Sequence, residues 1–319
     1  EEARGVTVVG NYAYVADGDS GLAIINISDP TNPGTPVYED TTGLATGITV
    51  VGNYAYIADR SSGLAIIDVS DPTNPGTPVY KDTSGQAFDV TVVGNYAYVA
   101  DLQSDLAIID ISDPTNPGNP VYKDTSGFAY GVTVVGNYAY LAIEDSGLAI
   151  IDVSDPTSPG NPVYMNTTNG SARDVTVAGN YAYVVDYSYG GGLAIIDITD
   201  KANPGSPVYM DTSGAAKGVT VVGNYAYVAD QQSGLAIIDI SDPTNPGNPV
   251  YKDTSGSAHG ITVVGNSAYL ADNTSGLAII PLNTGLIQDA ALNDATLTLA
   301  SPGATNSLGA NKELVVDTT

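Results

Sequence analysis

Short runs of apolar and β-branched residues, separated by polar turn sequences, recur along most of the chain. In the second unit the runs are Gly47–Val51, Tyr54–Asp59, Leu64–Val69 and Thr77–Asp82. They are rich in Val, Ile, Thr and Tyr, which favour extended strands. Between them, Gly52-Asn53 predicts a tight hairpin turn, and the Pro- and Asp-rich stretch at 70–76 predicts a rigid loop. Each unit therefore predicts four strands and no helix.

The units repeat with a nearly constant period. The glycine of the first turn in each unit falls at Gly10, Gly52, Gly94, Gly136, Gly179, Gly223 and Gly265. These positions are 42 to 44 residues apart, and a fixed period of this size indicates a repeat architecture. The chain therefore holds seven copies of one supersecondary unit.

Two features predict the order of strands within a unit. The third run, Leu-Ala-Ile-Ile-Asp in most copies, is almost entirely apolar and predicts a strand buried on both faces. A proline stands near the start of the fourth run, at Pro36, Pro78, Pro120, Pro162, Pro207 and Pro249. Because proline cannot donate a ladder hydrogen bond, the fourth strand is predicted to form the outer edge of each sheet.

Seven four-stranded antiparallel sheets of this length predict an all-β fold, the seven-bladed β-propeller. A parallel β-helix has shorter coils, and a leucine-rich repeat has a shorter period. Separate small domains are disfavoured because one such sheet cannot bury both of its faces. We expect the propeller over residues 1–282, with repeats near 4–45, 46–87, 88–129, 130–172, 173–216, 217–258 and 259–282. Residues 283–319 break the period and are expected to form a C-terminal tail or linker.

The composition narrows the function classes. Nine Lys and Arg stand against 35 Asp and Glu, so the net charge is −26. The electrostatic field of this negative charge repels nucleic acid and anionic membrane surfaces, and the charge keeps sheet-rich repeats soluble. We therefore expect no nucleic-acid partner and no direct membrane insertion. The absence of cysteine excludes disulfides, thiolate zinc sites and thiol catalysis.

The seven copies differ mainly at one side of the predicted ring, in the loops joining strand four to strand one and strand two to strand three. The position directly before strand one is occupied, in repeats one to seven, by Arg4, Thr46, Phe88, Tyr130, Arg173, Lys217 and His259. Two positions earlier, repeat four carries Phe128. The second loop carries Asp19, Arg60, Leu102, Glu144, Tyr187 with Tyr189, Gln231 and Asn273.

These variable slots predict a ligand site at the mouth of the channel. Arg4, Arg173, Lys217 and His259 form a cationic arc, which we expect to face an aromatic arc of Phe88, Phe128 and Tyr130, with Tyr187 and Tyr189 nearby. Guanidinium groups bind carboxylates, phosphates and sulfates, whereas aromatic faces stack on sugars. The pattern favours an anionic or carbohydrate-like ligand. The alternative is that exposed loop slots vary because nothing constrains them.

Four aspartates are candidates for a cation site. Asp17 and Asp19 resemble the start of a calcium loop, but the Gly and Glu of a full loop are missing, and the Asp17 slot recurs in six repeats. That recurrence favours turn capping. Asp89 and Asp174 replace the usual glycine at the start of strand one, where they could bind a cation or act as a carboxylate pair. The sequence predicts no catalytic residue and no cofactor, with Ca²⁺ left open.

The repeat sequence resembles a known family. Tyr-Val-Ala-Asp followed by Gly-Leu-Ala-Ile-Ile-Asp-Ile-Ser-Asp-Pro is similar to the LVIVD-repeat propellers of bacterial and archaeal surface proteins, over residues 4 to 282. The resemblance implies a propeller at an extracellular or cell-surface location, acting in interactions rather than in a defined chemistry. The tail resembles the linker into an immunoglobulin-like module of large adhesins.

These observations predict a non-catalytic recognition or adhesion module that binds a carbohydrate or other surface ligand, with other copies of itself as further partners. One alternative is an enzyme acting on an acidic polysaccharide at the channel mouth. Another is a structural spacer or assembly subunit of a surface layer or filament. Repeat seven lacks a Pro-Val-Tyr run, so we expect its outer strand from upstream of Glu1 in a parent chain, and here from the tail through Ala295–Ala300 or from a neighbouring molecule.

Overall fold

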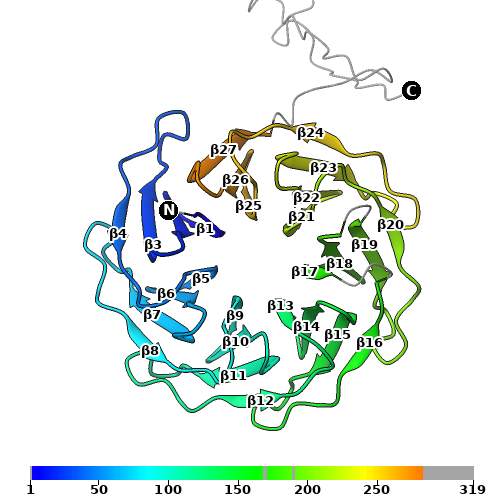
Figure 1. Cartoon of the computed structure of the whole chain (residues 1–319), viewed down its shortest axis with the longest axis horizontal. Coiled ribbons are helices and arrows are strands. Elements are labelled where there is room, and N and C mark those ends of the chain that lie inside the picture. The colour runs from blue at the N-terminus through cyan, green and yellow to red at the C-terminus, as the bar shows by residue number, and fades with distance from the viewer. Residues whose placement is uncertain (1, 168–170, 189–190, 283–319) are drawn as a thin grey trace, which may run out of the picture. The chain divides into compact units, whose positions relative to one another are not determined.

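The chain folds into a ring of seven antiparallel sheets around a central channel, as a computed structural model shows (Figure 1). The structure describes residues 2–167, 171–188 and 191–282. The ring is one compact unit, Glu1–Pro281. Within the described residues no helix is long and apolar enough to cross a membrane. The tail beyond residue 282, including the expected strand Ala295–Ala300, lies outside the described residues. The predicted fold class, a seven-bladed β-propeller, is confirmed.

Each blade orders its strands from the channel outward as they occur in the chain. The innermost strands are β1 (Gly5–Val9), β5 (Gly47–Val51), β9 (Asp89–Val93), β13 (Ala129–Val135), β17 (Ala172–Ala178), β21 (Gly218–Val222) and β25 (Gly260–Val264). The second strands are β2 (Tyr12–Ala16), β6 (Tyr54–Ala58), β10 (Tyr96–Ala100), β14 (Tyr138–Ile143), β18 (Tyr181–Asp186), β22 (Tyr225–Ala229) and β26 (Ser267–Ala271).

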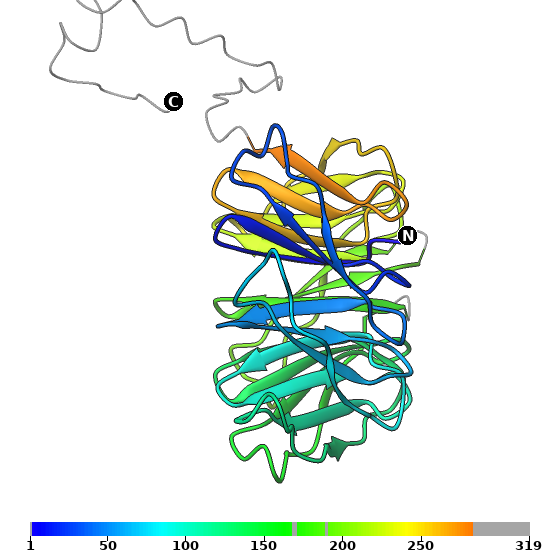
Figure 2. The same ribbon diagram turned by 90° about the vertical axis from the view of Figure 1, so that its left-hand side faces the viewer.

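The third and fourth strands complete the blades. The third strands are β3 (Leu22–Asn26), β7 (Leu64–Asp68), β11 (Leu106–Asp110), β15 (Gly147–Asp152), β19 (Gly192–Asp197), β23 (Leu235–Asp239) and β27 (Leu277–Pro281). The fourth are β4 (Val37–Glu39), β8 (Val79–Lys81), β12 (Val121–Lys123), β16 (Val163–Met165), β20 (Val208–Met210) and β24 (Val250–Lys252). Seen from the side, the strands run between the two faces of the ring, where the loops gather (Figure 2).

The fourth strands lie at the outer edge, as the prolines predict, but they are shorter than the sequence suggests. The expected run Thr77–Asp82 forms a strand only over Val79–Lys81. Pro78 has no N–H to donate, so pairing with β7 starts at Val79, opposite Ile66. The expected second run Tyr54–Asp59 also ends one residue early, because Asp59 turns out of the ladder and bonds to the neighbouring blade.

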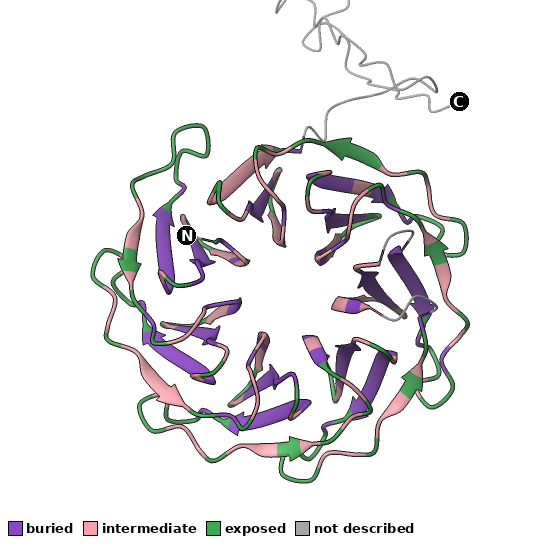
Figure 3. Ribbon diagram, viewed as in Figure 1, coloured by how far each residue is buried: buried purple, intermediate pink, exposed green. Residues whose placement is uncertain are grey.

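The hydrophobic core lies between blades rather than within them. The third strand of most blades is buried from its Leu to its second Ile, as Figure 3 shows in purple. In one such cluster Tyr14 and Ile24 of the first blade pack with Ile57 and Ile67 of the second. Each sheet therefore buries its faces only against its neighbours, which explains why a single unit could not fold alone.

A repeated hydrogen-bond contact also joins successive blades. Thr83 follows strand four of the second blade, and its hydroxyl donates to Asp101 at the end of β10, with an Oγ1–Oδ1 distance of 2.7 Å. The amide of Gly85 donates to the other oxygen of Asp101, at 2.9 Å. We call this the Thr–Asp contact. The same threonine–aspartate bond is formed by the pairs Thr41–Asp59, Thr212–Asp230 and Thr254–Asp272.

The last blade differs from the others within the described residues. Its sheet contains β25, β26 and β27 but no fourth strand. Leu277 to Ile280 of β27 are half-buried, whereas the matching residues of β7 are fully buried. The source of an outer strand for this blade stays a prediction, because the tail is outside the described part of the chain.

Candidate ligand site in the channel

A cavity of about 500 Å³ opens in the channel, lined by the first residues of the inner strands and by the turns that follow the second strands. It brings together seven residues that the sequence places at the mouth, namely Arg4, Phe88, Tyr130, Arg173, Tyr187, Lys217 and His259. It also contains Arg60, Asp89 and Asp174. All three arginines of the chain therefore line one cavity, although the protein as a whole is strongly acidic.

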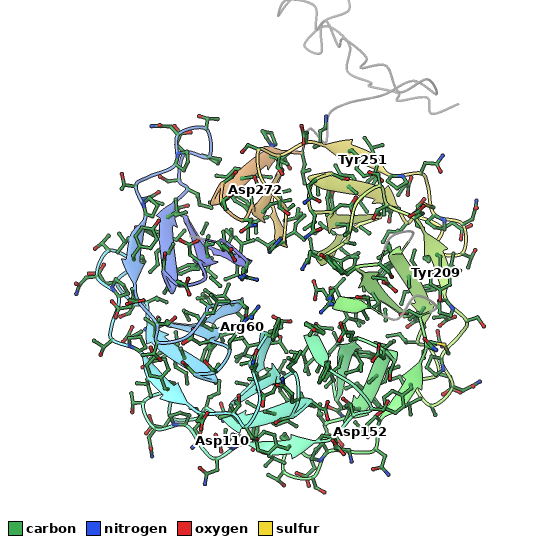
Figure 4. The ribbon with its side chains drawn as sticks, viewed as in Figure 1. Arg60, Asp110, Asp152, Tyr209, Tyr251 and Asp272 are labelled. Atoms are coloured by element: carbon green, nitrogen blue, oxygen red, sulfur yellow. The ribbon has the colours of Figure 1, made fainter. Side chains whose placement is uncertain are left out.

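Arg60 is the main residue that the predicted ligand set leaves out. It lies in the turn between β6 and β7, where its φ is 41°. Its amide donates to the carbonyl of Ala87, with an N–O distance of 3.0 Å, which holds the turn against the residue just before Phe88. Figure 4 shows Arg60 on the channel side of its blade. The pairing between blades could have identified Arg60. The turn after β6 pairs with Ala87, which lies just before the first strand of the next blade.

Cations lie on the aromatic rings instead of facing them across the mouth. The guanidinium of Arg60 is 4.4 Å from the ring centre of Phe88, and that of Arg173 is 3.8 Å from Tyr130. Lys217 Nζ is 4.3 Å from the ring centre of Tyr187. The rings of Phe88 and Tyr130 meet edge to face, with centres 4.9 Å apart. The two predicted arcs are thus interleaved, and Arg60, Arg173 and Lys217 each lie against an aromatic face.

Two of the four Lys and Arg side chains that line the cavity already have carboxylate partners. Arg173 bonds to Glu144, with an Nη2–Oε1 distance of 2.8 Å, and Arg4 pairs with Glu2. Among the described residues, Arg60 and Lys217 form no ion pair. The buried Nε–H groups of all three arginines also find no acceptor within the described part of the chain. Buried charges and hydrogen-bond donors in proteins normally have a partner. The charges of Arg60 and Lys217 and the arginine Nε–H groups have none among the described residues, so they are available to an anion.

Burial and the crowding of cations lower the pKa values of three basic groups in the cavity. Burial and the neighbouring charges of Arg173, Arg4 and Arg60 lower the pKa of Lys217 to about 8. Burial, together with Lys217 and Arg4, lowers the pKa of His259 to about 4, so this imidazole is neutral at pH 7. Burial also lowers the pKa of Arg60. Each lowered pKa reflects the cost of holding positive charge in a half-buried site among other cations.

The two predicted channel aspartates line the same cavity. Asp89 Oδ2 accepts the amide of Val132 in the next blade at 3.0 Å, and Asp174 Oδ2 accepts that of Val219 at 2.9 Å. Burial raises the pKa of both, and the charge of Asp89 helps to raise the pKa of Asp174 to about 7. Each carboxylate thus fastens its strand to the next blade while sharing a low-dielectric channel with the other.

Titration of Asp174 should contribute stability that increases as the pH falls from 8 to about 5. The folded chain binds a proton at Asp174 near pH 7, whereas an unfolded aspartate binds one only near pH 4, so protonation favours the folded state across this window. Between pH 8 and pH 5.5 we expect the melting temperature of the protein, measured by thermal unfolding, to rise by several degrees relative to that of Asp174→Asn. This comparison removes the effect of lower net charge and that of His259, whose pKa of about 4 makes acidification below pH 6.5 destabilising. An equal pH dependence of the two proteins would contradict this assignment.

Three other predicted residues, Phe128, Asp17 and Asp19, do not line the cavity, and a fourth is not described. Phe128 is 43% exposed and does not line the cavity, and neither do Leu44 and Gln86, which hold the same position in other blades. Tyr189 lies outside the described residues. Asp17 is buried in a turn in which its carbonyl accepts the amide of Ser20 at 2.9 Å, while Asp19 is exposed. In the described part of the chain no three metal-binding side chains converge.

The repeats identify the class of protein that this ring defines. The model of the LVIVD repeat matches residues 2–36, 42–79, 84–120, 126–167, 169–212, 213–249 and 255–281. These segments cover most of the chain and coincide with the seven blades. The chain belongs to the LVIVD-repeat family. A comparison with curated proteins finds no match.

Solved structures with the same architecture are distant in sequence. The chain is similar to the β-propeller domain of Cps50 (Swd1) from Myceliophteria thermophila, with 10% identity, a TM-score of 0.69, and coverage of 88% of this chain and 97% of that one. It is also similar to BamB from Moraxella catarrhalis, with 17% identity, a TM-score of 0.58, and coverage of 87% and 82%. The computationally designed Ika8 protein gives 9% identity, a TM-score of 0.66, and coverage of 88% and 84%. At these identities the likeness shows the fold alone.

Proposed function

We propose that this propeller is a non-catalytic extracellular recognition module that binds an anionic, carbohydrate-like ligand in the channel. The observation that carries the proposal is the pair Arg60 and Lys217, which lie half-buried on aromatic rings and lack a carboxylate partner among the described residues. A cavity of about 500 Å³ suits one or two sugar rings. The cell-surface location rests on the resemblance of the repeats to surface proteins.

The chemistry of the cavity supports a ligand with both charge and hydroxyl groups. The cations offer fork-shaped donors for carboxylates or sulfates. The carboxylates of Asp89 and Asp174 line the same cavity and can accept hydrogen bonds from hydroxyl groups. The half-buried rings of Phe88, Tyr130 and Tyr187 line the cavity and add apolar surface for a sugar ring. A sulfated or uronic-acid oligosaccharide meets all three requirements.

Titration calorimetry should distinguish this ligand class from others. Sulfated and uronic-acid oligosaccharides should bind the protein at pH 7, whereas neutral oligosaccharides of equal length should not. Binding should weaken with added salt. It should also weaken between pH 7 and 9, because Lys217 has its pKa near 8 and loses its charge in that range. Equal binding of neutral and acidic oligosaccharides would contradict the proposal, and no binding by the whole panel would favour a structural spacer or assembly subunit.

One observation favours a second candidate, an enzyme acting on an acidic polysaccharide. A carboxyl group with a pKa near 7 can act as a general acid, and Asp174 lies in the cavity with a second carboxyl group, Asp89. Both carboxylates are engaged by backbone amides, which explains them equally well as blade contacts. Incubation with the bound oligosaccharide separates the two functions. Release of reducing ends that Asp174→Asn abolishes would establish the enzyme.

A further inference from the structure

A second cavity lies between the fourth and fifth blades, at the end of the strands opposite the channel cavity. Its volume is about 370 Å³, and we call it the seam cavity. The turn after β13, Gly136-Asn137, forms part of its wall, whereas the channel cavity is lined by the start of the same strand, at Tyr130 and Gly131. The function proposed for the channel does not use the seam cavity, so a ligand bound here occupies a separate site.

One residue of this wall departs from the repeats. Lys201 lies in the loop between β19 and β20 and lines the seam cavity. In five other repeats the same position is a proline, namely Pro30, Pro72, Pro114, Pro156 and Pro243. The loop keeps its backbone bond, because the amide of Asn203 donates to the carbonyl of Asp200 at 3.1 Å. The amide of Asn74 donates to the carbonyl of Asp71 in the same way, at 3.0 Å. The lysine is therefore not needed to form the loop.

The ammonium group of Lys201 has an aromatic neighbour but no carboxylate partner in the described part of the chain. Its Nζ lies 5.2 Å from the ring centre of Tyr138 in the fourth blade, so the side chain reaches across the boundary between the blades. The carboxylate next to it in the sequence, that of Asp200, accepts the amide of Ala202 at 3.0 Å. The charge of Lys201 is therefore available to an anion at the wall of the seam cavity.

The other walls of the seam cavity are mostly apolar. Val135, Val177 and Ile198 provide aliphatic surface, and Tyr138 provides an aromatic ring. Val135 is 46% exposed, so part of this apolar surface faces solvent. Apolar surface next to one cation matches a molecule that has an apolar body and one negative charge. A polyanion is disfavoured, because the protein has a net charge of −26 and Lys201 is the one Lys or Arg of this wall among the described residues.

We propose that the seam cavity binds a small aromatic carboxylic acid, whose carboxylate pairs with Lys201 and whose ring packs on the valines and Tyr138. Charge complementarity favours the acid, because a neutral molecule leaves the ammonium group without a partner. The apolar wall favours an aromatic ring over a sugar, because it offers few groups that bond to hydroxyls. The volume of about 370 Å³ lies in the range of cavities that hold small molecules.

The test is methyl NMR of the full chain, titrated with indole-3-acetate and with indole-3-ethanol as its uncharged counterpart. We expect the acid to cause saturable shifts of the methyl signals of Val135 and Val177, and the alcohol to bind about fivefold more weakly, the size of one partly exposed ion pair. Two variants should weaken binding of the acid by a similar factor. Lys201→Pro restores the residue of the other repeats, and Lys201→Met keeps the apolar part of the side chain without its charge.

Lys252→Met is the matched control, since Lys252 is exposed on β24 and lines neither cavity. It removes one charge from the protein and should leave binding within about twofold of the original. The proposal is overturned if the two valines show no saturable shifts, if the alcohol binds as well as the acid, or if the Lys201 variants bind no more weakly than Lys252→Met. It also fails if Arg60→Ala, Lys217→Ala removes the shifts, because the acid then binds in the channel. Failure of this proposal leaves the oligosaccharide prediction for the channel unaffected.

Discussion

The double variant Arg60→Ala, Lys217→Ala should lose affinity for an acidic oligosaccharide by about 10²- to 10⁴-fold, because each charge-assisted contact contributes about 1.5–3 kcal/mol. Both side chains lie in the cavity without a carboxylate partner among the described residues, so neither charge is already satisfied. The dependence of affinity on salt should become shallower, since two cations no longer exchange counterions. Calorimetry at two salt concentrations measures both effects.

A matched control separates local contacts from the overall charge. Lys81→Ala, Lys123→Ala removes the same number of cations, but these lysines lie on outer strands and donate to Asn119 and Asn161, at 2.8 and 2.9 Å. We expect the affinity of this control to stay within a few-fold of the original. If both double variants lose affinity equally, the ligand responds to net charge and the channel site is wrong.

The variant Asp101→Ala should destabilise the protein by about 3–5 kcal/mol, because it leaves a buried hydroxyl and a half-buried amide without an acceptor. Asp101 is fully buried and accepts bonds from Thr83 and Gly85 of the preceding blade. Its loss breaks the Thr–Asp contact between the second and third blades. Thermal unfolding should show a clear drop in melting temperature, with Asp101→Asn intermediate because the amide oxygen still accepts one bond.

Asp113→Ala is the control for this prediction. Asp113 has the same kind of partner, Thr115, with an Oγ1–Oδ1 distance of 2.6 Å, but the pair lies in an exposed loop within one blade. Water can replace its bonds, so the melting temperature should change much less. Equal effects of the two substitutions would mean that the Thr–Asp contact does not hold the blades together.

Much of the fold could be predicted because each blade is specified by local signals that are repeated. The inner strand Gly47–Val51 has the bounds that its pattern predicts, since a glycine turn ends it. The outer strands were expected to be longer, because a run of strand-forming residues does not reveal that Pro78 prevents pairing before Val79. Missing strand contacts, as at β27, could be noticed only because six complete copies show what is normal.

The site was harder to predict, since it depends on which loops meet. The slot before strand one correctly placed Arg4, Phe88 and His259 in the cavity. Arg60 comes from the preceding blade, and only the pairing between Arg60 and Ala87 brings it to Phe88. Phe128 lies outside the cavity because the residues directly before strand one line the channel, whereas those two positions earlier do not, and the sequence pattern does not distinguish the two positions.

The Thr–Asp contact has a consequence for how such a chain can change over generations. The second and sixth blades each offer the same acceptor to the preceding blade and the same donor to the next one, as in Thr41–Asp59 and Thr83–Asp101. A duplicated blade would therefore fit between its parents without any new contact having to arise. The channel residues occupy positions that this contact does not use, so they can diverge while the ring persists. Gene duplication can thus supply new blades, and later point mutations can alter what the channel binds.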